Sequence, residues 1–234
     1  MFDNRIKQIF DTINKSFETI NKPYLSISWG KDSILLLYFV RQVNPKVKCV
    51  YLNSGYALPD TYEVRDRLLQ EWDMNYSEIK SDYFAIKDFK PPDQRTKQEQ
   101  KKYVDILKKI PFDKFAKENG YDGNFWGIRA CESIGRKHLI KTNGLLFKSS
   151  NGLYRSSPIG WVTNEELWYF YDKFNIPMNL IYTKTKFINK DQIRNTGWLS
   201  TDGEDRGRII WLRHYYPQQY KKLITMYPYL RGIT

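Results

Sequence analysis

The residues best suited to chemistry lie together at 28–33, with the sequence SWGKDS. An apolar segment precedes them and an apolar run follows, so the pattern predicts a strand, a tight turn and a helix. The N-terminus of a helix offers unpaired backbone N–H groups and the positive end of the helix dipole, so anions bind there. Gly30 would let a phosphate approach the backbone, Lys31 would add a positive charge, and Asp32 would hold Mg²⁺. A phosphate site is therefore predicted, and the alternative is a serine-capped core helix.

A second polar stretch with chemical potential begins at Gly127. Arg129, Glu132 and Arg136 recur at helical spacing, so the pattern predicts that they share one face of a helix. Two guanidinium groups placed in this way can bind phosphates bidentately, with the carboxylate orienting them. The alternative is a ladder of surface ion pairs. Because the stretch directly follows a predicted strand, phosphate binding is favoured.

Thiol and metal chemistry have few residues to draw on. The chain has two cysteines and two histidines, too few for a disulfide framework, a four-cysteine metal site or zinc. Cys49 falls in a predicted strand and is expected to be a core residue. Cys131 lies beside Arg129, which could lower the pKa of its thiol. The favoured alternative is that Cys131 is a small packed residue.

Composition limits the class of protein. The 234 residues carry a net charge of +12, which favours an anionic partner such as a nucleotide or a nucleic acid. The alternative is a lysine-rich surface that serves only solubility. An aromatic content of 16% argues against disorder. No apolar run of about 18 residues is present, and the first residues lack a signal-peptide core. We therefore expect no membrane segment and a cytoplasmic location.

Alternating strands and helices must position these residues. Such alternation predicts an α/β fold with a Rossmann-like parallel sheet, wound right-handedly and covered by helices on both faces. Ligands then bind beyond the carboxyl ends of the strands, where the 28–33 and 53–59 loops would meet. We expect strands at 24–28, 46–52, 75–80 and 124–128, a hairpin at 144–149 and 153–156, and helices at 3–20, 34–40, 60–72 and 163–174.

Two basic regions interrupt or follow this pattern. Residues 83–120 are predicted to form a charged helical insertion over the pocket, and the alternative is a solvated helix without a role. Residues 184–234 are predicted to be a basic, aromatic extension packed on a domain formed by residues 1–183. It ends in an amphipathic helix, and the alternative there is packing by its apolar residues with the charges in water. The cations expected to contact DNA or RNA phosphates are Lys97, Lys101, Lys102, Arg206, Arg208 and Arg213.

The stretch at 28–33 resembles the pyrophosphate loop of the ATP pyrophosphatase superfamily, also called the PP-loop or adenine nucleotide alpha hydrolase superfamily. That loop is usually written S-G-G-x-D-S, and Trp29 stands where the first glycine is usual. Residues 127–136 look like the G-x-R-x-x-E-S-x-x-R element of phosphoadenosine phosphosulfate (PAPS) reductase relatives. Two further elements of that family have similar counterparts, in the same order, at 51–61 and 158–182.

The resemblance covers about residues 22–183 and implies a domain that binds an adenine nucleotide, with ATP and Mg²⁺ as cofactors. Residues 51–55 would lie against adenine and ribose, although Asn53 and Ser54 replace the usual Asp and Thr. The catalytic residues that it implies are Lys31, Asp32, Arg129 and Arg136. The nucleotide-contacting residues that it implies are Ser28, Trp29, Gly30, Lys31, Asp32, Ser33, Leu52, Asn53, Ser54, Gly55, Gly127, Arg129 and Glu132.

Two chemistries divide these relatives. The reductases attack a sulfonucleotide sulfur with a cysteine near the C-terminus, whereas the pyrophosphatases split ATP between the α and β phosphates and adenylate a substrate. Where relatives carry Arg-x-Gly-Cys-x-x-Cys, residues 194–201 read RNTGWLST. Tryptophan and serine do not replace a thiolate at neutral pH, and no iron–sulfur ligand set remains.

We therefore expect ATP pyrophosphatase chemistry with adenylate transfer, in nucleic-acid modification or thiolation. Two alternatives stay open: a sulfonucleotide reductase, and a nucleotide-binding partner subunit without turnover. Trp29 and Asn53, which depart from the pattern of the family, keep the second alternative open. The acceptor and the oligomeric state are not specified by the residues, and a homodimer is one option.

Overall fold

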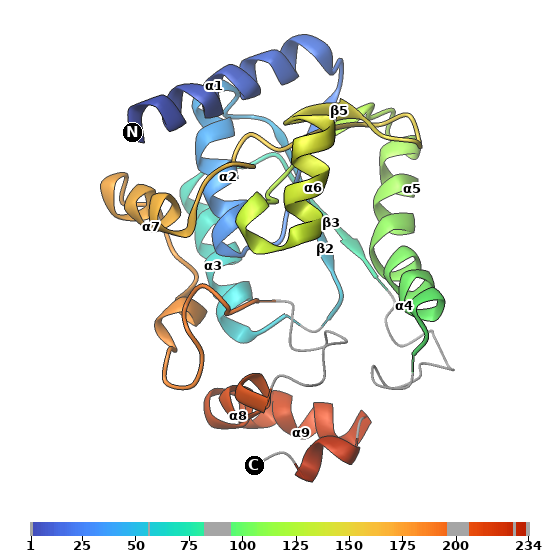
Figure 1. Ribbon diagram of the computed structural model, residues 1–234, viewed down its shortest axis with the longest axis vertical. Coiled ribbons are helices and arrows are strands. Elements are labelled where there is room, and N and C mark those ends of the chain that lie inside the picture. Colours follow the sequence, from blue (N-terminus) through green and yellow to red (C-terminus); the bar gives the residue numbers. More distant parts are fainter. Residues whose placement is uncertain (1, 56, 82–94, 196–205, 227, 233–234) are drawn as a thin grey trace.

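The computed structural model describes residues 2–55, 57–81, 95–195, 206–226 and 228–232. Its strands are β1 (Pro23–Ile27), β2 (Lys48–Asn53), β3 (Tyr76–Lys80), β4 (Gly123–Trp126), β5 (Leu146–Lys148) and β6 (Tyr154–Ser156). Its α-helices are α1 (Phe2–Thr19), α2 (Lys31–Val43), α3 (Pro59–Glu71), α4 (Lys97–Val104), α5 (Ile110–Glu118), α6 (Ile134–Asn143), α7 (Asn164–Lys173), α8 (Arg206–Tyr215) and α9 (Pro217–Met226). Figure 1 shows their arrangement.

One mixed sheet, in the order β3-β2-β1-β4-β6-β5, organises the chain. Every neighbouring pair is parallel except β5 and β6, which form the antiparallel hairpin at one edge. The predicted α/β fold with a mostly parallel sheet is confirmed, and so is the predicted hairpin. Because β1 lies between β2 and β4, the loop after β1 lies at the middle of the carboxyl edge of the sheet.

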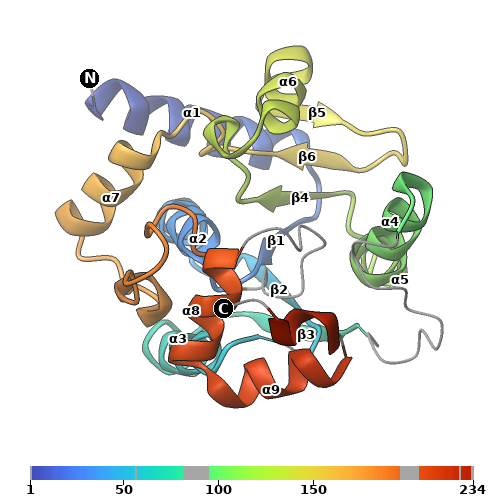
Figure 2. The ribbon, with the colours of Figure 1, turned by 60° about the horizontal axis from the view of Figure 1, so that its bottom comes forward.

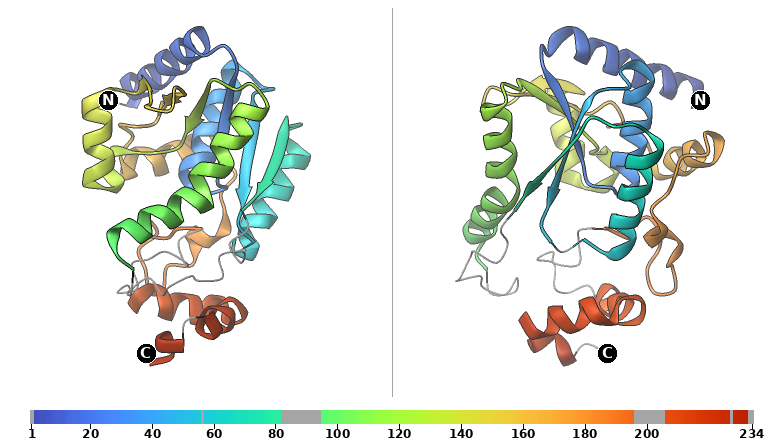
Figure 3. Two further views of the ribbon diagram at one scale, coloured as in Figure 1. Left: turned by 90° about the vertical axis from the view of Figure 1, so that its right-hand side faces the viewer. Right: turned by 180° about the vertical axis from the view of Figure 1, so that it is seen from behind.

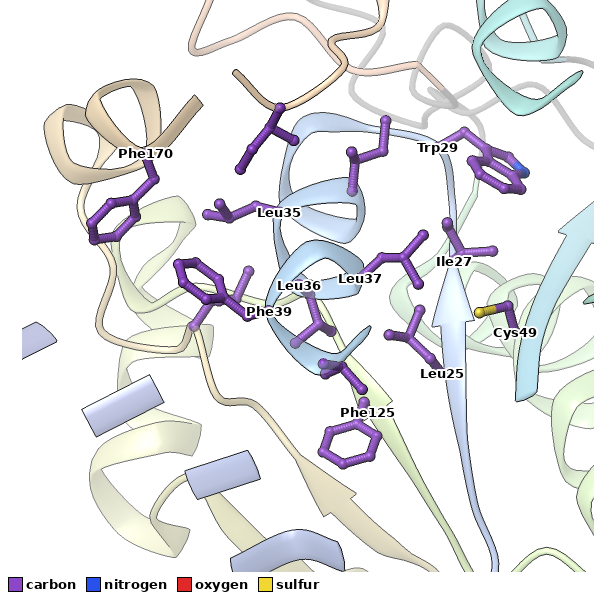
Figure 4. Packing of buried hydrophobic residues seen from close by; sticks show 14 of the residues in the cluster. Leu25, Ile27, Trp29, Leu35, Leu36, Leu37, Phe39, Cys49, Phe125 and Phe170 are labelled. Carbon is purple, nitrogen blue, oxygen red and sulfur yellow. The ribbon is translucent and has the colours of Figure 1, made fainter. Parts of the chain in front are cut away.

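Helix α2 forms the centre of the main hydrophobic core. Its residues Ile34–Leu37, Phe39 and Val40 are buried, because the run is apolar on nearly every face. They pack with Leu25 and Ile27 of β1 and with Phe125 of β4, as Figure 4 shows. Helices α1 and α7 supply further apolar side chains to the same cluster. The strand and helix on both sides of the 28–33 loop are therefore fixed by burial.

The opposite face of the sheet is covered by α5. Tyr24 and Val50 project from β1 and β2 toward this face and pack with Ala116, Phe112 and Phe115 of α5. Residues 97–118 are helical, as expected for this charged region. Their last part is the crossover that connects β3 to β4 and covers the sheet, and Figure 3 shows helices on both faces.

The C-terminal helices pack on the carboxyl side of the sheet. Ile209, Trp211 and Leu212 of α8 are buried in a separate cluster that also contains Leu58 and Tyr182. Figure 2 shows α8 and α9 next to α3. Among the helices in the described ranges, none combines the length and the apolarity needed to cross a membrane.

Polar contacts reinforce the packing of this C-terminal region. The buried carboxylate of Asp60 accepts a hydrogen bond of 2.6 Å from the Tyr216 hydroxyl and forms an ion pair with Lys184. Lys184 Nζ also donates to the Tyr216 hydroxyl at 2.9 Å. Asp60 lies in the first turn of α3, so this cluster connects the end of the 53–59 loop to the extension.

Candidate functional site

The carboxyl ends of β1 and β2 border a cavity of about 420 Å³. One wall is the loop after β1, with Ser28, Gly30 and Lys31, and a second is the end of β2. Helix α4 and the turn that follows it form a third wall, and residues 193–195 of the C-terminal region form part of the rim. The cavity therefore joins the predicted phosphate loop to parts of the chain that the motifs do not include.

Trp29 has an unusual conformation within the loop. Its φ is +60°, in the left-handed region that glycine adopts most readily. Its side chain is fully buried and packs edge-on against Tyr51 and close to Tyr76. Figure 4 shows the indole within the hydrophobic cluster. Trp29 is not among the described residues that line the cavity, and its contact with the nucleotide stays a prediction.

Replacing Trp29 tests this account of the loop. Both Trp29→Ala and Trp29→Gly should lower the free energy of unfolding by about 3–5 kcal/mol, because each leaves a large cavity. At most positions a glycine variant is less stable than the alanine variant. At position 29 we expect the reverse: Trp29→Gly should be about 1 kcal/mol more stable than Trp29→Ala, because glycine adopts φ +60° without strain. Urea unfolding measures both variants, and a Trp29→Ala protein more stable than Trp29→Gly would contradict the assignment.

The turn from β1 into α2 leaves little space for side chains. Gly30 is the N-cap of α2 and has no side chain to cap the helix. A Cβ atom at Gly30 would lie 3.1 Å from the hydroxyl oxygen of Tyr182 and 3.0 Å from Asn195 Oδ1. A Cβ atom at Gly127 would lie 3.1 Å from the backbone of Asp32. These two glycines therefore allow the end of β4 and the C-terminal region to approach the loop.

Buried polar side chains hold the loop backbone. Asn179 donates to the carbonyl of Trp29 at 3.0 Å, and Asn195 donates to the carbonyl of Ser28. The Ser28 backbone N–H donates to Ser33 Oγ at 3.1 Å. Because both asparagines lie far from the loop in sequence, its shape depends on tertiary contacts.

Asp32 is engaged in ion pairs on both carboxylate oxygens. Oδ1 lies 2.5 Å from Arg129 Nε, and Oδ2 lies 3.0 Å from Lys31 Nζ. Burial alone would raise the pKa of Asp32, but the charges of Lys31 and Arg129 outweigh it and hold that pKa below its ordinary value. Holding Mg²⁺ would require Asp32 to release a cation, so the carboxylate does not fit the predicted metal role, and we assign no step to the metal.

The stretch 129–136 differs from the predicted single helix. Arg129 has an extended backbone, residues 130–132 form a 3₁₀ turn, and Ser133 begins α6 by accepting a hydrogen bond from the Arg136 N–H at 3.2 Å. The prediction that Arg129, Glu132 and Arg136 share one helix face was therefore wrong. Ser133 is a strong N-cap residue, which explains the break.

The two arginines consequently have different surroundings. Arg129 is 1% exposed and, besides Asp32, donates to the Val162 carbonyl at 3.1 Å and to Asn164 at 3.0 Å. Arg136 is half-buried, lines the cavity and pairs with Glu132. Glu132 also accepts from the Arg129 backbone N–H at 2.8 Å. Arg136 is thus placed to meet a ligand, whereas Arg129 supports the loop through Asp32.

The basic side of the cavity includes two residues that the motifs did not assign. Lys108 and Arg194 line it together with Arg136, and neither forms an ion pair within the described part of the chain. Lys108 is an exposed residue, but desolvation by the surrounding protein lowers its pKa, and the charges of Arg136 and Arg194 lower it further. Three cations that line one cavity are suited to binding an anion.

Lys108 reaches this position from an irregular turn. Asp105–Lys109 is a π-helical segment, in which the Ile110 N–H bonds the Asp105 carbonyl. Such segments are rare and often lie at functional sites. Nothing in the local sequence distinguishes Lys108 from the adjacent lysine, so its role required the tertiary structure. The sequence offered one indication of a role for Arg194: it begins the stretch 194–201, where relatives carry Arg-x-Gly-Cys-x-x-Cys.

The end of β2 provides the apolar side of the cavity. Tyr51 and Leu52 line it together with Leu107, and Ser54 lies at the same edge. Asn53 instead points away from it, accepting from the Gly55 N–H at 2.8 Å and donating to Glu78 at 2.9 Å. Of the predicted contacts in this element, Leu52 and Ser54 border the cavity, and Asn53 and Gly55 shape the loop.

The cysteines do not reach the cavity. Cys49 is buried in β2 as expected, and burial raises its pKa to about 12. Partial burial also raises the pKa of Cys131, and the guanidinium of Arg129, 3.0 Å from Sγ, does not offset this. The raised pKa of Cys131 therefore does not support activation of its thiol by Arg129. In addition, neither cysteine lines the cavity.

The predicted nucleic-acid contacts are dispersed over two helices. Lys97, Lys101 and Lys102 are exposed on α4, and Arg213 is exposed on α8. Arg208 is partly buried in α8, and the side chain of Arg206 lies outside the described residues. Figure 1 shows α8 beyond the carboxyl edge of the sheet and α4 beside the end of β3.

Comparisons with known proteins agree with this geometry. The phosphoadenosine phosphosulfate reductase domain family matches residues 22–221. The chain is 23% identical over 192 residues to a phosphoadenosine 5'-phosphosulfate reductase of Citrobacter koseri, covering 81% of this chain and 77% of that protein.

Two solved structures have a similar fold. A PAPS reductase from Candida auris has a TM-score of 0.59 at 15% identity, covering 78% of this chain and 89% of that one. An FMN adenylyltransferase from Candida glabrata, in complex with FMN and an ATP analogue, has a TM-score of 0.53 at 18% identity. The match covers 77% of this chain and 60% of that one. At these identities the likeness establishes the fold.

Proposed function

Since the chain belongs to the phosphoadenosine phosphosulfate reductase domain family, we propose that it binds ATP in the cavity at the ends of β1 and β2. We further propose that it cleaves ATP between the α and β phosphates and transfers the adenylate to an acceptor. The observation that carries this proposal is the composition of the cavity. The N-terminus of α2 and the cations of Lys31, Lys108, Arg136 and Arg194 lie beside an apolar wall.

Each part of the cavity suits a part of the nucleotide. A flat base fits against the apolar wall of Tyr51, Leu52 and Leu107, since small-molecule sites are mostly apolar with few polar groups. The triphosphate then extends toward the loop and the basic residues. Negative charge that develops on the leaving pyrophosphate would be stabilised by Lys108, Arg136 and Arg194. Lys31 is largely occupied by Asp32 and contributes chiefly to the shape and field of the loop.

Sulfonucleotide reduction is the first alternative, and the absence of a thiol from the cavity lining argues against it. A reductase of this type needs a thiolate in contact with the sulfonucleotide, and the raised pKa of Cys131 keeps its thiol protonated. The Candida glabrata neighbour, which is an adenylyltransferase, has a similar fold, so this fold is compatible with adenylate transfer. The acceptor here is a separate question, because that likeness is one of fold.

The products of ATP distinguish the alternatives. Purified protein incubated with ATP and a panel of tRNA, DNA and small-molecule acceptors should release AMP and pyrophosphate, measured by anion-exchange chromatography. Release of ADP and phosphate would contradict the proposal. ATP binding without turnover on any acceptor would favour the partner-subunit alternative. Sulfite release from a sulfonucleotide with a thiol reductant would favour the reductase.

A polyanionic acceptor is the second part of the proposal. Exposed cations lie on α4, which forms one wall of the cavity, and on α8, and they would bind the phosphates of a nucleic-acid acceptor. Neutralising phosphates releases counterions, so binding to DNA or RNA should weaken steeply as salt rises. Filter binding at several salt concentrations tests it. If binding does not vary with the salt concentration, these charges serve only solubility.

A further inference from the structure

Tyr182 lies at the junction of the loop and the cavity. It belongs to the 3₁₀ turn Leu180–Thr183, is 4% exposed, and lines the cavity. Its hydroxyl oxygen accepts a hydrogen bond of 3.0 Å from the backbone N–H of Lys31, the first residue of α2. On the other side of the same residue, the Tyr171 hydroxyl donates to the Lys31 carbonyl at 2.7 Å. Two buried tyrosines therefore hold both backbone groups of Lys31.

The two hydroxyls differ in what their protons do. The proton of Tyr171 is used in the bond to the Lys31 carbonyl, and Tyr171 does not line the cavity. The oxygen of Tyr182 receives the Lys31 N–H, so its own proton must point elsewhere. In the described part of the chain no acceptor takes that proton.

Burial keeps the Tyr182 hydroxyl protonated. It raises the pKa of Tyr182 far above neutrality, and the nearby negative charge of Asp32 adds to the effect. A buried donor without an acceptor is unfavourable and uncommon in folded proteins. The missing acceptor is therefore expected from a molecule that enters the cavity. Lys31 Nζ lies 5.5 Å from the Tyr182 ring, which makes an anionic acceptor favourable.

We propose that the Tyr182 hydroxyl donates a hydrogen bond to a phosphate oxygen of the nucleotide held by the 28–33 loop. This proposal rests on the proposed function, because it names a further binding residue of the same site. In the chain Lys31 N–H to Tyr182 O–H to phosphate, each bond polarises the next. Tyr182 thereby extends the positive end of α2 into the cavity.

The test compares Tyr182→Phe with Tyr171→Phe by calorimetry, using ATP, inorganic pyrophosphate and adenosine as probes. Each variant loses one buried hydroxyl bonded to Lys31, so their losses of stability should be similar. Tyr182→Phe should weaken the binding of ATP and pyrophosphate at least about tenfold, because a hydrogen bond to a charged group is lost. Its binding of adenosine should be unchanged. Tyr171→Phe should alter all three affinities by less than about threefold.

Several outcomes would overturn the proposal. They are an unchanged ATP affinity of Tyr182→Phe, an equal loss for adenosine, and an equal loss in Tyr171→Phe, which would mean that Tyr182 only shapes the loop. Pyrophosphate separates the two proposals. If the wild type binds pyrophosphate through Tyr182 but does not bind ATP, the proposed function fails and this inference stands.

A measurement on the wild type guards against a variant that does not fold. In tyrosine-labelled protein, the hydroxyl proton of Tyr182 should become visible by NMR, shifted downfield, when pyrophosphate is added. Close approach to the Lys31 amide proton identifies the signal. If pyrophosphate binds and that proton neither shifts nor slows its exchange, the proposal is refuted.

Discussion

Replacing Asp32 with alanine is expected to lower the free energy of unfolding by about 3–5 kcal/mol. Arg129 is 1% exposed and pairs with Asp32 through Nε at 2.5 Å. Without the carboxylate, the guanidinium would be a buried charge that keeps only neutral partners, at Val162 and Asn164. The loss should therefore appear in stability before it appears in nucleotide binding.

The same pair predicts how stability depends on pH. The pKa of Asp32 is lower in the folded state than its ordinary value, so the unfolded chain binds the proton more tightly. The contribution of Asp32 is then fully present above its unfolded pKa and is lost as the pH falls through its folded pKa. Stability measured from neutral to acid pH should fall less steeply in Asp32→Ala than in the wild type.

A control is available in the exposed carboxylate of Asp66, which lies 2.7 Å from Arg65. Asp66→Ala should cost about 1 kcal/mol or less, because solvent screens the charge of Asp66 and Arg65 keeps its ion pair with Glu78. Urea unfolding compares the two variants. Equal losses in Asp32→Ala and Asp66→Ala would mean that the buried pair has no special role.

The second large effect is expected on binding. The double variant Lys108→Ala with Arg194→Ala should weaken ATP binding at least about a hundredfold, because each charge-assisted contact to a phosphate contributes about 1.5–3 kcal/mol. Stability should change little or even rise, because Lys108 is repelled by both Arg136 and Arg194 in the free protein. Calorimetry with ATP measures the first effect and thermal unfolding the second.

The control must remove the same charge elsewhere. Lys109→Ala with Lys186→Ala lowers the net charge equally, and both lysines are exposed and do not line the cavity. This pair should weaken ATP binding only about threefold or less, through long-range charge alone. If both double variants lose affinity equally, the three cations at the cavity do not form a specific site.

Local patterns were sufficient for the framework of the site. The apolar run of α2, the alternation of strands and helices, and Asn151-Gly152 at the hairpin turn each depend on neighbours in sequence. The expected strands and helices therefore lie close to the observed ones. The 28–33 loop after β1 is likewise at the predicted edge of the sheet, beside the cavity.

What could not be predicted depends on contacts between distant segments. Arg129 and Arg136 looked equivalent in sequence, but burial against Asp32 separates their roles. Ser133 did carry a local sign of the break, because serine is a common N-cap. Lys108 gave no such sign, since the fold alone brings it to the cavity. Tyr182 ends an element that resembles the family, but its position beside Lys31 depends on the fold.

The π-helical turn at Asp105–Lys109 connects α4 to α5. The number of residues in this segment sets how the two helices are rotated relative to each other. Before the turn, Tyr103 and Val104 line the cavity; after it, Phe112 also borders the cavity and packs near Tyr24 on the sheet. A π turn holds one residue more than an α turn spans. Deleting that residue would rotate one half relative to the other by about 100°. Insertions and deletions, rather than substitutions, are therefore the changes by which related chains would reshape this wall while the sheet contact is kept.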